Sequence, residues 1–287
     1  MNDYGKKGLI GVLTPQANTT VEPEFWTLLP TGWSLINTRL TSKKKTIESR
    51  LVDYTKNFEK TAEQFANAPV NIIASACTGA SYLIGQKAEL EIKIEMENRY
   101  KVPFVTAALA TVNALRDLDV KKISLLSPYP DTLTKASVDY WQGYNFEVAS
   151  ISGPKLETEE FHPIYAMAGS GVLQAYRELS DSASDVVVMM GTGMSTLTSL
   201  YQGQKENLKA AFSCNSALVW SCCRKHAPSE TPSMETWMNS MMPASYSTQM
   251  ARWTIRCLFS KNFIVGTPTC TLLCGSDSNV APRDRAS

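Results

Sequence analysis

The chain has 287 residues, of which 44% are hydrophobic and 19% are charged, a balance typical of a globular protein with a substantial core. Lysine and arginine number 28 against 27 acidic residues, so the net charge of +1 provides no basic field for binding nucleic acid or an anionic membrane. No apolar run approaches the length of about 20 residues that a transmembrane helix requires. The seven cysteines are odd in number and unevenly spaced. We therefore expect a reduced, cytoplasmic protein without nucleic-acid or membrane partners.

Short β-rich runs alternate along the chain with stretches in which apolar residues recur every three or four positions. The predicted strands are residues 8–13, 33–38, 70–76, 102–107, 122–127, 146–151 and 185–190. The predicted helices are residues 48–68, 80–100, 131–144 and 161–180. Because the strand runs are apolar almost throughout, they predict an α/β fold in which helices cover both faces of parallel sheet.

Two pairs of segments recur at nearly the same spacing. IGVLTPQANTTV resembles ISLLSPYPDTLT at an offset of 113 residues, from Ile10 to Ile123, and IIASACTGAS resembles VVVMMGTGMS at an offset of 114, from Cys77 to Gly191. This repetition predicts two similar lobes within residues 1–225. We place the lobes at about 8–110 and 120–212 and a closing helix at 215–225, and we assign residues 226–287, which lack a strong period, to an atypical tail.

Four polar segments directly follow predicted strands. They are TPQANT at 14–19, ACTGAS at 76–81, SPYPDT at 127–132 and GTGMST at 191–196. Ligands of parallel α/β sheets bind at such strand ends, where helix N-termini present free N–H groups to anions. Hydroxyls, an amide, a phenol and glycines suit a carboxylate pocket. Helix caps and turns use the same residue types, which is the alternative for any one segment alone.

Cys77 stands in one of these four segments. The N-terminus of the helix that follows would lower its thiol pKa from about 8.5 and make it partly thiolate. The alternative is a small buried hydrophobe, which is the usual state of a free cysteine. Cys214, Cys222 and Cys223 lie on or near an apolar helix and are interpreted as packing residues. The chain has only two histidines, and we predict no metal site.

Taken together, these motifs resemble the aspartate/glutamate racemase superfamily, and within it the branch of maleate cis-trans isomerases and arylmalonate decarboxylases. The resemblance covers roughly residues 8–225 and rests on GVLTPQANTTVEPEF, ACTGAS, the Ser127-Pro128-Tyr129 turn, GTGMST and SCNSALVW. It implies two pseudo-symmetric lobes of parallel β-sheet flanked by helices, with the active site in the cleft between them. It also implies chemistry without a cofactor on a small carboxylic or dicarboxylic acid.

In the racemases, one cysteine from each lobe faces the substrate carbon, whereas this chain has Gly191 where the second cysteine would stand. The resemblance therefore implies that Cys77 acts from one face, with Gly191 as the opposite wall and Tyr129 bound to a carboxylate. The implied substrate-binding residues are Pro15, Asn18, Thr78, Gly79, Ser127, Thr192, Gly193 and Asn215.

A single cysteine can deliver one proton to one face, which favours decarboxylation of a malonate-type acid with Cys77 protonating the enediolate intermediate. The first alternative is cis-trans isomerisation of a maleate-type acid, with Cys77 as the nucleophile. The others are racemase-like chemistry, with His162 as the first candidate for a second base, and an inactive carboxylate-binding protein. The sequence leaves homo-oligomerisation open.

Overall fold

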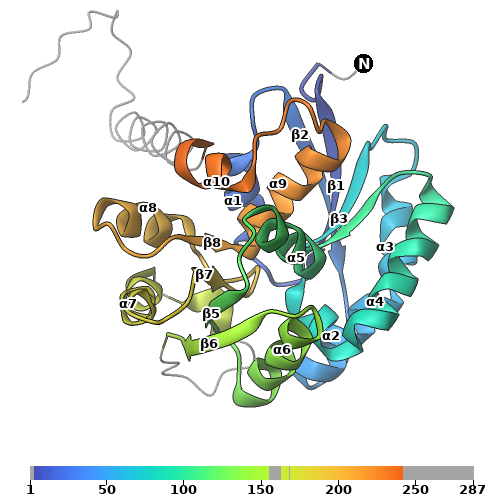
Figure 1. Cartoon of the computed structure of the whole chain (residues 1–287). Helices are drawn as coiled ribbons and strands as arrows, with labels where there is room; N and C mark the ends of the chain where they lie inside the picture. The colour runs from blue at the N-terminus through green and yellow to red at the C-terminus, as the bar shows by residue number, and fades with distance from the viewer. Residues whose placement is uncertain (1–2, 155–162, 168, 242–287) are drawn as a thin grey trace, which may run out of the picture. The chain divides into compact units, whose positions relative to one another are not determined.

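Two parallel four-stranded sheets with the same strand order form the framework of the molecule (Figure 1). The computed structural model describes residues 3–154, 163–167 and 169–241. The first sheet has the order β2-β1-β3-β4 and comprises β1 (Gly8–Pro15), β2 (Trp33–Leu40), β3 (Ile72–Ser75) and β4 (Phe104–Thr106). The second has the order β6-β5-β7-β8 and comprises β5 (Lys122–Leu126), β6 (Glu147–Ser152), β7 (Val186–Met189) and β8 (Ala211–Ser213). The predicted fold of two pseudo-symmetric α/β lobes is confirmed.

Helices connect the strands of each sheet in the order expected of parallel pairing. The first lobe, built on the first sheet, contains α1 (Val21–Leu28), α2 (Ile47–Lys56), α3 (Phe58–Ala62), η1 (Glu63–Phe65), α4 (Thr78–Tyr100) and α5 (Ala107–Asp117). The second lobe contains α6 (Asp131–Gly143), η2 (Pro163–Ala166), α7 (Gly169–Ser180), α8 (Leu197–Lys205) and α9 (Cys214–His226), followed by α10 (Met234–Thr236) and η3 (Trp237–Met241).

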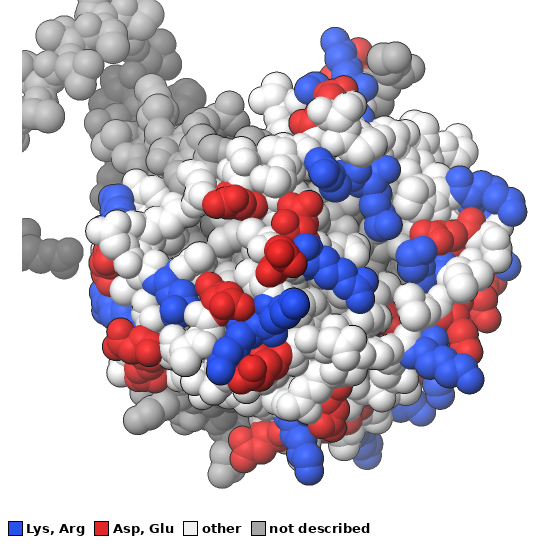
Figure 2. All heavy atoms as spheres, in the orientation of Figure 1, with Lys and Arg blue, Asp and Glu red and all other residues white. Residues whose placement is uncertain are grey.

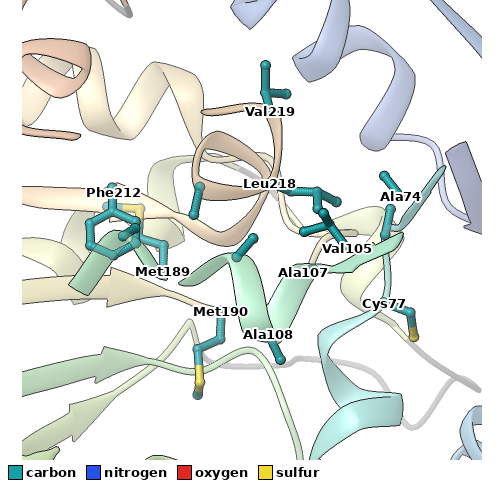
Figure 3. Close-up of a cluster of buried hydrophobic side chains, with 14 of the residues drawn as sticks. Ala74, Cys77, Val105, Ala107, Ala108, Met189, Met190, Phe212, Leu218 and Val219 are labelled. Atoms are coloured by element: carbon teal, nitrogen blue, oxygen red, sulfur yellow. The ribbon is translucent and has the colours of Figure 1, made fainter. Parts of the chain in front are cut away.

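The central strands are buried because helices cover them on both sides. Every residue of β1, β3 and β7 is buried. Helices α5 and α9, which follow the last strand of each sheet, pack against each other, and α9 also contacts strands of both sheets. Figure 3 shows Ala74 and Val105 of the first sheet near Leu218 of α9, with Met189 and Phe212 of the second sheet in the same buried cluster. One apolar core therefore joins the two lobes.

The structure contains elements that the hydrophobic pattern does not predict. Strand β8 has only three residues. Helix α5 is rich in alanine and buried on most of its circumference, so it has no polar stripe to reveal a helical period. Helix α1 carries Pro23 in its first turn, where proline is tolerated. The predicted helix at 48–68 is divided at Asn57 into α2 and α3.

Part of the segment assigned to the tail packs on the body of the protein. Met234 and Trp237 are fully buried, Trp220 Nε1 donates to Pro232 O at 3.0 Å, and Met234 N donates to Asp117 Oδ2 at 2.7 Å. Residues 242–287 lie outside the described residues. The division of the chain into two lobes, a closing helix and a tail at the predicted boundaries stays a prediction.

The surface carries charges of both signs. Figure 2 shows acidic and basic side chains interspersed on one face of the molecule, in keeping with the net charge of +1. Within the part of the chain that the structure describes, no helix has the length and apolar character needed to cross a membrane.

Candidate active site

A small cavity lies between residues of the two lobes, at the carboxyl ends of β1, β3 and β7. Its volume is about 20 Å³, which is room for about one water molecule. It includes most of the predicted site residues, and its lining consists of Pro15, Leu51, Cys77, Thr78, Gly79, Tyr129, Ile164, Tyr165, Thr192 and Gly193. None of these described lining residues is lysine, arginine or histidine. The described lining residues therefore offer neutral hydroxyl and backbone N–H groups as hydrogen-bond donors.

Cys77 follows β3 and is the residue immediately before helix α4. Its side chain is buried, and Figure 3 places it at the margin of the buried cluster. Burial raises the pKa of the Cys77 thiol to about 12, although a hydrogen bond from the Ala80 backbone acts in the opposite direction. The expectation of a partly ionised thiol is therefore wrong for this closed cavity, because desolvation outweighs the helix N-terminus.

Tyr129 and Thr78 bring one hydroxyl from each lobe to the cavity. Tyr129 Oη and Thr78 Oγ1 share a hydrogen bond of 2.7 Å. Burial raises the pKa of Tyr129 well above its ordinary value, so the phenol stays protonated and can donate a hydrogen bond. Ser127 stabilises the turn that carries Tyr129, because its Oγ accepts a hydrogen bond from Tyr129 N at 3.3 Å and lies 2.7 Å from Thr134 Oγ1. In this conformation Ser127 does not line the cavity.

Gly191 stands at a position that only glycine fits without strain. Its φ is +83°, and a Cβ built on it would lie 2.7 Å from Pro128 Cγ and 2.9 Å from Ile164 Cδ1. The same Cβ would lie 3.4 Å from Tyr129 Oη, so Gly191 borders the cavity without lining it. Neighbouring side chains thus fill the place where a second catalytic thiol would project.

Ile164 and Tyr165 form a wall of the cavity that the sequence analysis missed. A Cβ on Gly193 would lie 2.5 Å from the Tyr165 ring, so the aromatic ring rests directly on the glycine. The apolar spacing predicts one helix over residues 161–180, whereas Ile164 and Tyr165 belong to the short η2 and α7 begins at Gly169, so the pattern gave no sign of a cavity wall here. His162 lies outside the described residues, and its role as a base stays a prediction.

Asn18 joins the β1–α1 connection to the loop that follows β7. Its Oδ1 accepts from Thr20 N at 2.9 Å and from Val21 N at 3.1 Å, which caps the start of α1. Its Nδ2 donates to Thr192 Oγ1 at 3.2 Å, and Thr192 Oγ1 donates to Ala76 O at 2.7 Å. The loop after β7 therefore touches the residue that precedes Cys77.

Asn215 is fully buried at the start of α9 and does not line the cavity. Its Nδ2 donates to Glu24 Oε2 at 2.7 Å and to Thr192 O at 3.1 Å. In this conformation it orients the loop after β7, and its predicted contact with substrate stays a prediction. Cys214 beside it is also buried, and burial raises the pKa of its thiol. Repulsion between a Cys214 thiolate and negative charge on Glu24 or Cys77 acts in the same direction.

The arrangement can stabilise negative charge that develops on a bound acid. The first turn of α4 begins at Thr78, so the residues that line the cavity include the start of a helix, with its free backbone N–H groups, and the hydroxyl residues Thr78 and Tyr129. Among the residues that the structure describes, no group of three or more His, Cys, Asp or Glu is placed to hold a metal ion.

Comparison with known proteins connects this geometry with a family. The family model for arylmalonate decarboxylase matches residues 10–235. Maleate isomerase of Alcaligenes faecalis is 25% identical over 228 residues, which cover 74% of this chain and 87% of that protein.

Solved structures share the fold. Maleate isomerase Iso of Pseudomonas putida S16 has a TM-score of 0.66 at 20% identity, with 75% of this chain and 91% of that chain covered. A Nocardia farcinica maleate cis-trans isomerase mutant with a covalently bound succinylcysteine intermediate has a TM-score of 0.66 at 22% identity, with 76% and 92% covered. These matches confirm the resemblance that the motifs indicated. The chain belongs to the arylmalonate decarboxylase family.

Proposed function

We propose that the protein is a cofactor-independent cis-trans isomerase of a small unsaturated dicarboxylic acid of the maleate type, with Cys77 as the nucleophile. The observation that carries the proposal is that Cys77 is the single thiol among the described residues that line a cavity of neutral donors formed by both lobes. The similar protein from Alcaligenes faecalis is named maleate isomerase, and the Nocardia farcinica neighbour was solved with succinylcysteine. These two similar proteins favour isomerisation over the decarboxylation that the sequence motifs first favoured.

The reaction needs only one sulfur atom. Cys77 Sγ forms a bond to one alkene carbon, and the π electrons of the alkene move onto the neighbouring carboxylate to give an enediolate. The thiol proton passes to a carboxylate oxygen, which becomes strongly basic as the enediolate forms. The former double bond is now single and rotates. The electron pair and the proton then return, the S–C bond breaks, and the trans acid leaves with the thiol restored.

This proton transfer agrees with the raised pKa of Cys77. Burial in the closed cavity raises the pKa of Cys77 to about 12, so the thiol is largely protonated at neutral pH in the free protein, and we propose that sulfur attack and proton transfer are concerted. Tyr129, Thr78 and the N-terminus of α4 would stabilise the enediolate, and such preorganised donors contribute about 3 kcal/mol each to lowering a barrier.

Substrate entry requires the cavity to expand. A volume of about 20 Å³ holds one water molecule and no dicarboxylic acid. Ile164 and Tyr165 belong to the short η2 element and close the cavity against Gly193. We propose that displacement of these two side chains opens the site.

Decarboxylation of a malonate-type acid is the second candidate. The observation that favours it is the burial of Cys77, because burial raises the thiol pKa and a protonated thiol is a proton donor. After CO₂ leaves, Cys77 would protonate the enediolate on one face, and Gly191 offers no acid or base on the other. The product of a prochiral malonate would then be a single enantiomer.

Turnover of maleate and phenylmalonate in D₂O distinguishes the two activities. For the isomerase we expect maleate to become fumarate without deuterium at carbon, because the alkene carbons are never protonated. Cys77→Ala should abolish this conversion, whereas Cys223→Ala in buried α9 should leave it unchanged. Release of CO₂ from phenylmalonate without conversion of maleate would contradict the isomerase proposal and support the decarboxylase. Binding of maleate with neither reaction would leave a carboxylate-binding protein.

A further inference from the structure

Helix α8 in the second lobe takes its N-terminal cap from the first lobe. Thr196 precedes the helix, but its own side chain makes no capping hydrogen bond. Glu24 Oε1 of α1 instead accepts from Thr196 N at 2.6 Å, from Thr196 Oγ1 at 2.9 Å and from Leu197 N at 3.3 Å. A carboxylate here satisfies free N–H groups and complements the helix dipole. The cap therefore ties α1 to the end of the loop at 191–196.

The other carboxylate oxygen of Glu24 is connected through Asn215 to the beginning of the same loop. Glu24 Oε2 accepts from Asn215 Nδ2, and the same Nδ2 donates to Thr192 O. Asn215 Oδ1 is buried and has no hydrogen-bond partner. Turning the amide over would set Oδ1 against the oxygens of Glu24 and Thr192, so the hydrogen bond to Glu24 Oε2 determines which way Asn215 faces. Asn215 thus transmits the position of Glu24 to Thr192.

Two further contacts hold the loop between these points. Thr20 Oγ1 donates to Gly193 O at 2.8 Å, and Asn18 Nδ2 donates to Thr192 Oγ1. Thr192 and Gly193 are the second-lobe loop residues that line the cavity. Residues 18–24 of the first lobe are therefore connected by hydrogen bonds to the start, the middle and the end of this loop.

The carboxylate of Glu24 is almost completely buried, with 5% of the residue exposed. Burial raises its pKa, while hydrogen bonds from Thr196, Asn215 and Leu197 act in the opposite direction. No lysine or arginine is paired with it among the described salt bridges. A buried carboxyl group without a cation depends on such oriented donors, so the donors and the loop that carries them are held to one geometry.

We propose that Glu24 is a positioning residue for catalysis, which fixes Thr192 and Gly193 of the second lobe against the substrate through the α8 cap and Asn215. Glu24 touches neither the cavity nor the reacting atoms. The inference rests on the proposed function for its effect on turnover, but its effect on the loop is independent of which acid is the substrate.

Glu24→Gln tests this role because it keeps the size of the side chain and replaces one acceptor oxygen with an N–H₂ group. That group must face either Asn215 Nδ2 or the N–H groups of α8, and both are donors. Glu89→Gln is the matched control: Glu89 is 1% exposed and accepts from Thr106 and Tyr140, and it makes no hydrogen bond to the loop at 191–196.

Amide hydrogen exchange of the segment 190–197 is the first measurement, and it requires no substrate. We expect exchange at least tenfold faster in Glu24→Gln than in the wild type, and unchanged in Glu89→Gln. The second measurement is maleate turnover, for which Glu24→Gln should lower kcat 10-fold to 100-fold, change KM less than threefold, and leave Glu89→Gln within twofold of the wild type. Unchanged exchange in the 190–197 segment overturns the proposal, and so does unchanged kcat in the presence of faster exchange.

Two results separate this inference from the proposed function. If wild-type protein leaves maleate unchanged, the isomerase proposal fails, and hydrogen exchange alone decides the role of Glu24 in holding the loop. If Glu24→Gln does not fold, Thr196→Val removes a single hydroxyl donor to Glu24 and should produce a smaller increase in exchange of the same segment. Exchange at the wild-type rate in Thr196→Val would then overturn the proposal.

Discussion

Cys77 is the residue on which the proposed chemistry depends, and burial favours its protonated form. Burial raises its pKa to about 12, whereas an exposed thiol has a pKa of about 8.5. The ionised fraction falls about tenfold for each pH unit below the pKa. Free Cys77 should therefore be a poor nucleophile at neutral pH, although it lies beside a helix N-terminus.

We predict that iodoacetamide at pH 7 labels Cys77 more than about a hundredfold slower than it labels free glutathione. The rate should rise about tenfold per pH unit up to at least pH 10, because more thiolate forms as the pH approaches the raised pKa. Mass spectrometry of the peptide that contains Cys77 gives the rate separately from those of the other cysteines. A rate equal to that of glutathione at pH 7 would show that the pKa of Cys77 is close to that of a free thiol, which would contradict the predicted effect of burial.

Tyr129 supplies a protonated phenol at the cavity. We predict that Tyr129→Phe lowers kcat by about 10-fold to 1,000-fold, because the enediolate loses a preorganised donor. The free energy of unfolding should fall by only about 1 kcal/mol, for the hydrogen bond to Thr78. Tyr176→Phe is the control, since Tyr176 is also buried and donates to Lys209 O away from the cavity. Equal activity of the wild type and Tyr129→Phe would make Tyr129 a turn residue.

Gly191 is required for backbone reasons as well as for space. We predict that Gly191→Ala lowers the free energy of unfolding by at least about 1 to 2 kcal/mol, because its φ of +83° disfavours a Cβ that also overlaps Pro128 and Ile164. Gly169→Ala is the comparison, since no atom lies within 4 Å of its added Cβ. Urea unfolding measures both variants. Equal stability of Gly191→Ala and the wild type would contradict the strained position, and would leave room for a second thiol.

Helix α4 is bent between the turns that reach the cavity and the longer part that covers the first sheet. Gly85 has φ 77° and ψ 167°, which divides α4 after Ile84, so the short first part carries Thr78 and Gly79. The sequence predicts a continuous helix here because its apolar spacing runs through Gly85 without interruption. The break depends on the backbone conformation of Gly85, which the spacing of apolar residues does not indicate.

We predict that Gly85→Ala destabilises the protein by about 1 to 2 kcal/mol and lowers kcat as well. The added methyl group meets no atom within 4 Å, so the whole effect comes from the positive φ. Urea unfolding and maleate turnover measure the two consequences. If Gly85→Ala is as stable and as active as the wild type, the bend does not position Thr78 and Gly79.

At the scale of the whole molecule, the sequence repeat predicts the architecture because each repeat specifies the same strand order. Most of the predicted site residues line the cavity for a related reason: they follow parallel strands, whose carboxyl ends meet at one edge. Ile164, Tyr165 and Leu51 could not be predicted, since they come from segments without a strand-end motif. Glu24 was missed because its role depends on contacts with residues more than 170 positions away.

A covalent bond between Cys77 and its substrate is the feature that defines the proposed mechanism, and it can be detected directly. Wild-type protein should be mixed with maleate, quenched in acid during turnover and digested for mass spectrometry. Because the acid protonates the trapped enediolate at carbon, we expect a succinyl adduct on the Cys77 peptide, no adduct on the peptide that contains Cys214, and neither adduct nor fumarate with Cys77→Ala. Formation of fumarate by Cys77→Ala at the wild-type rate would contradict the account.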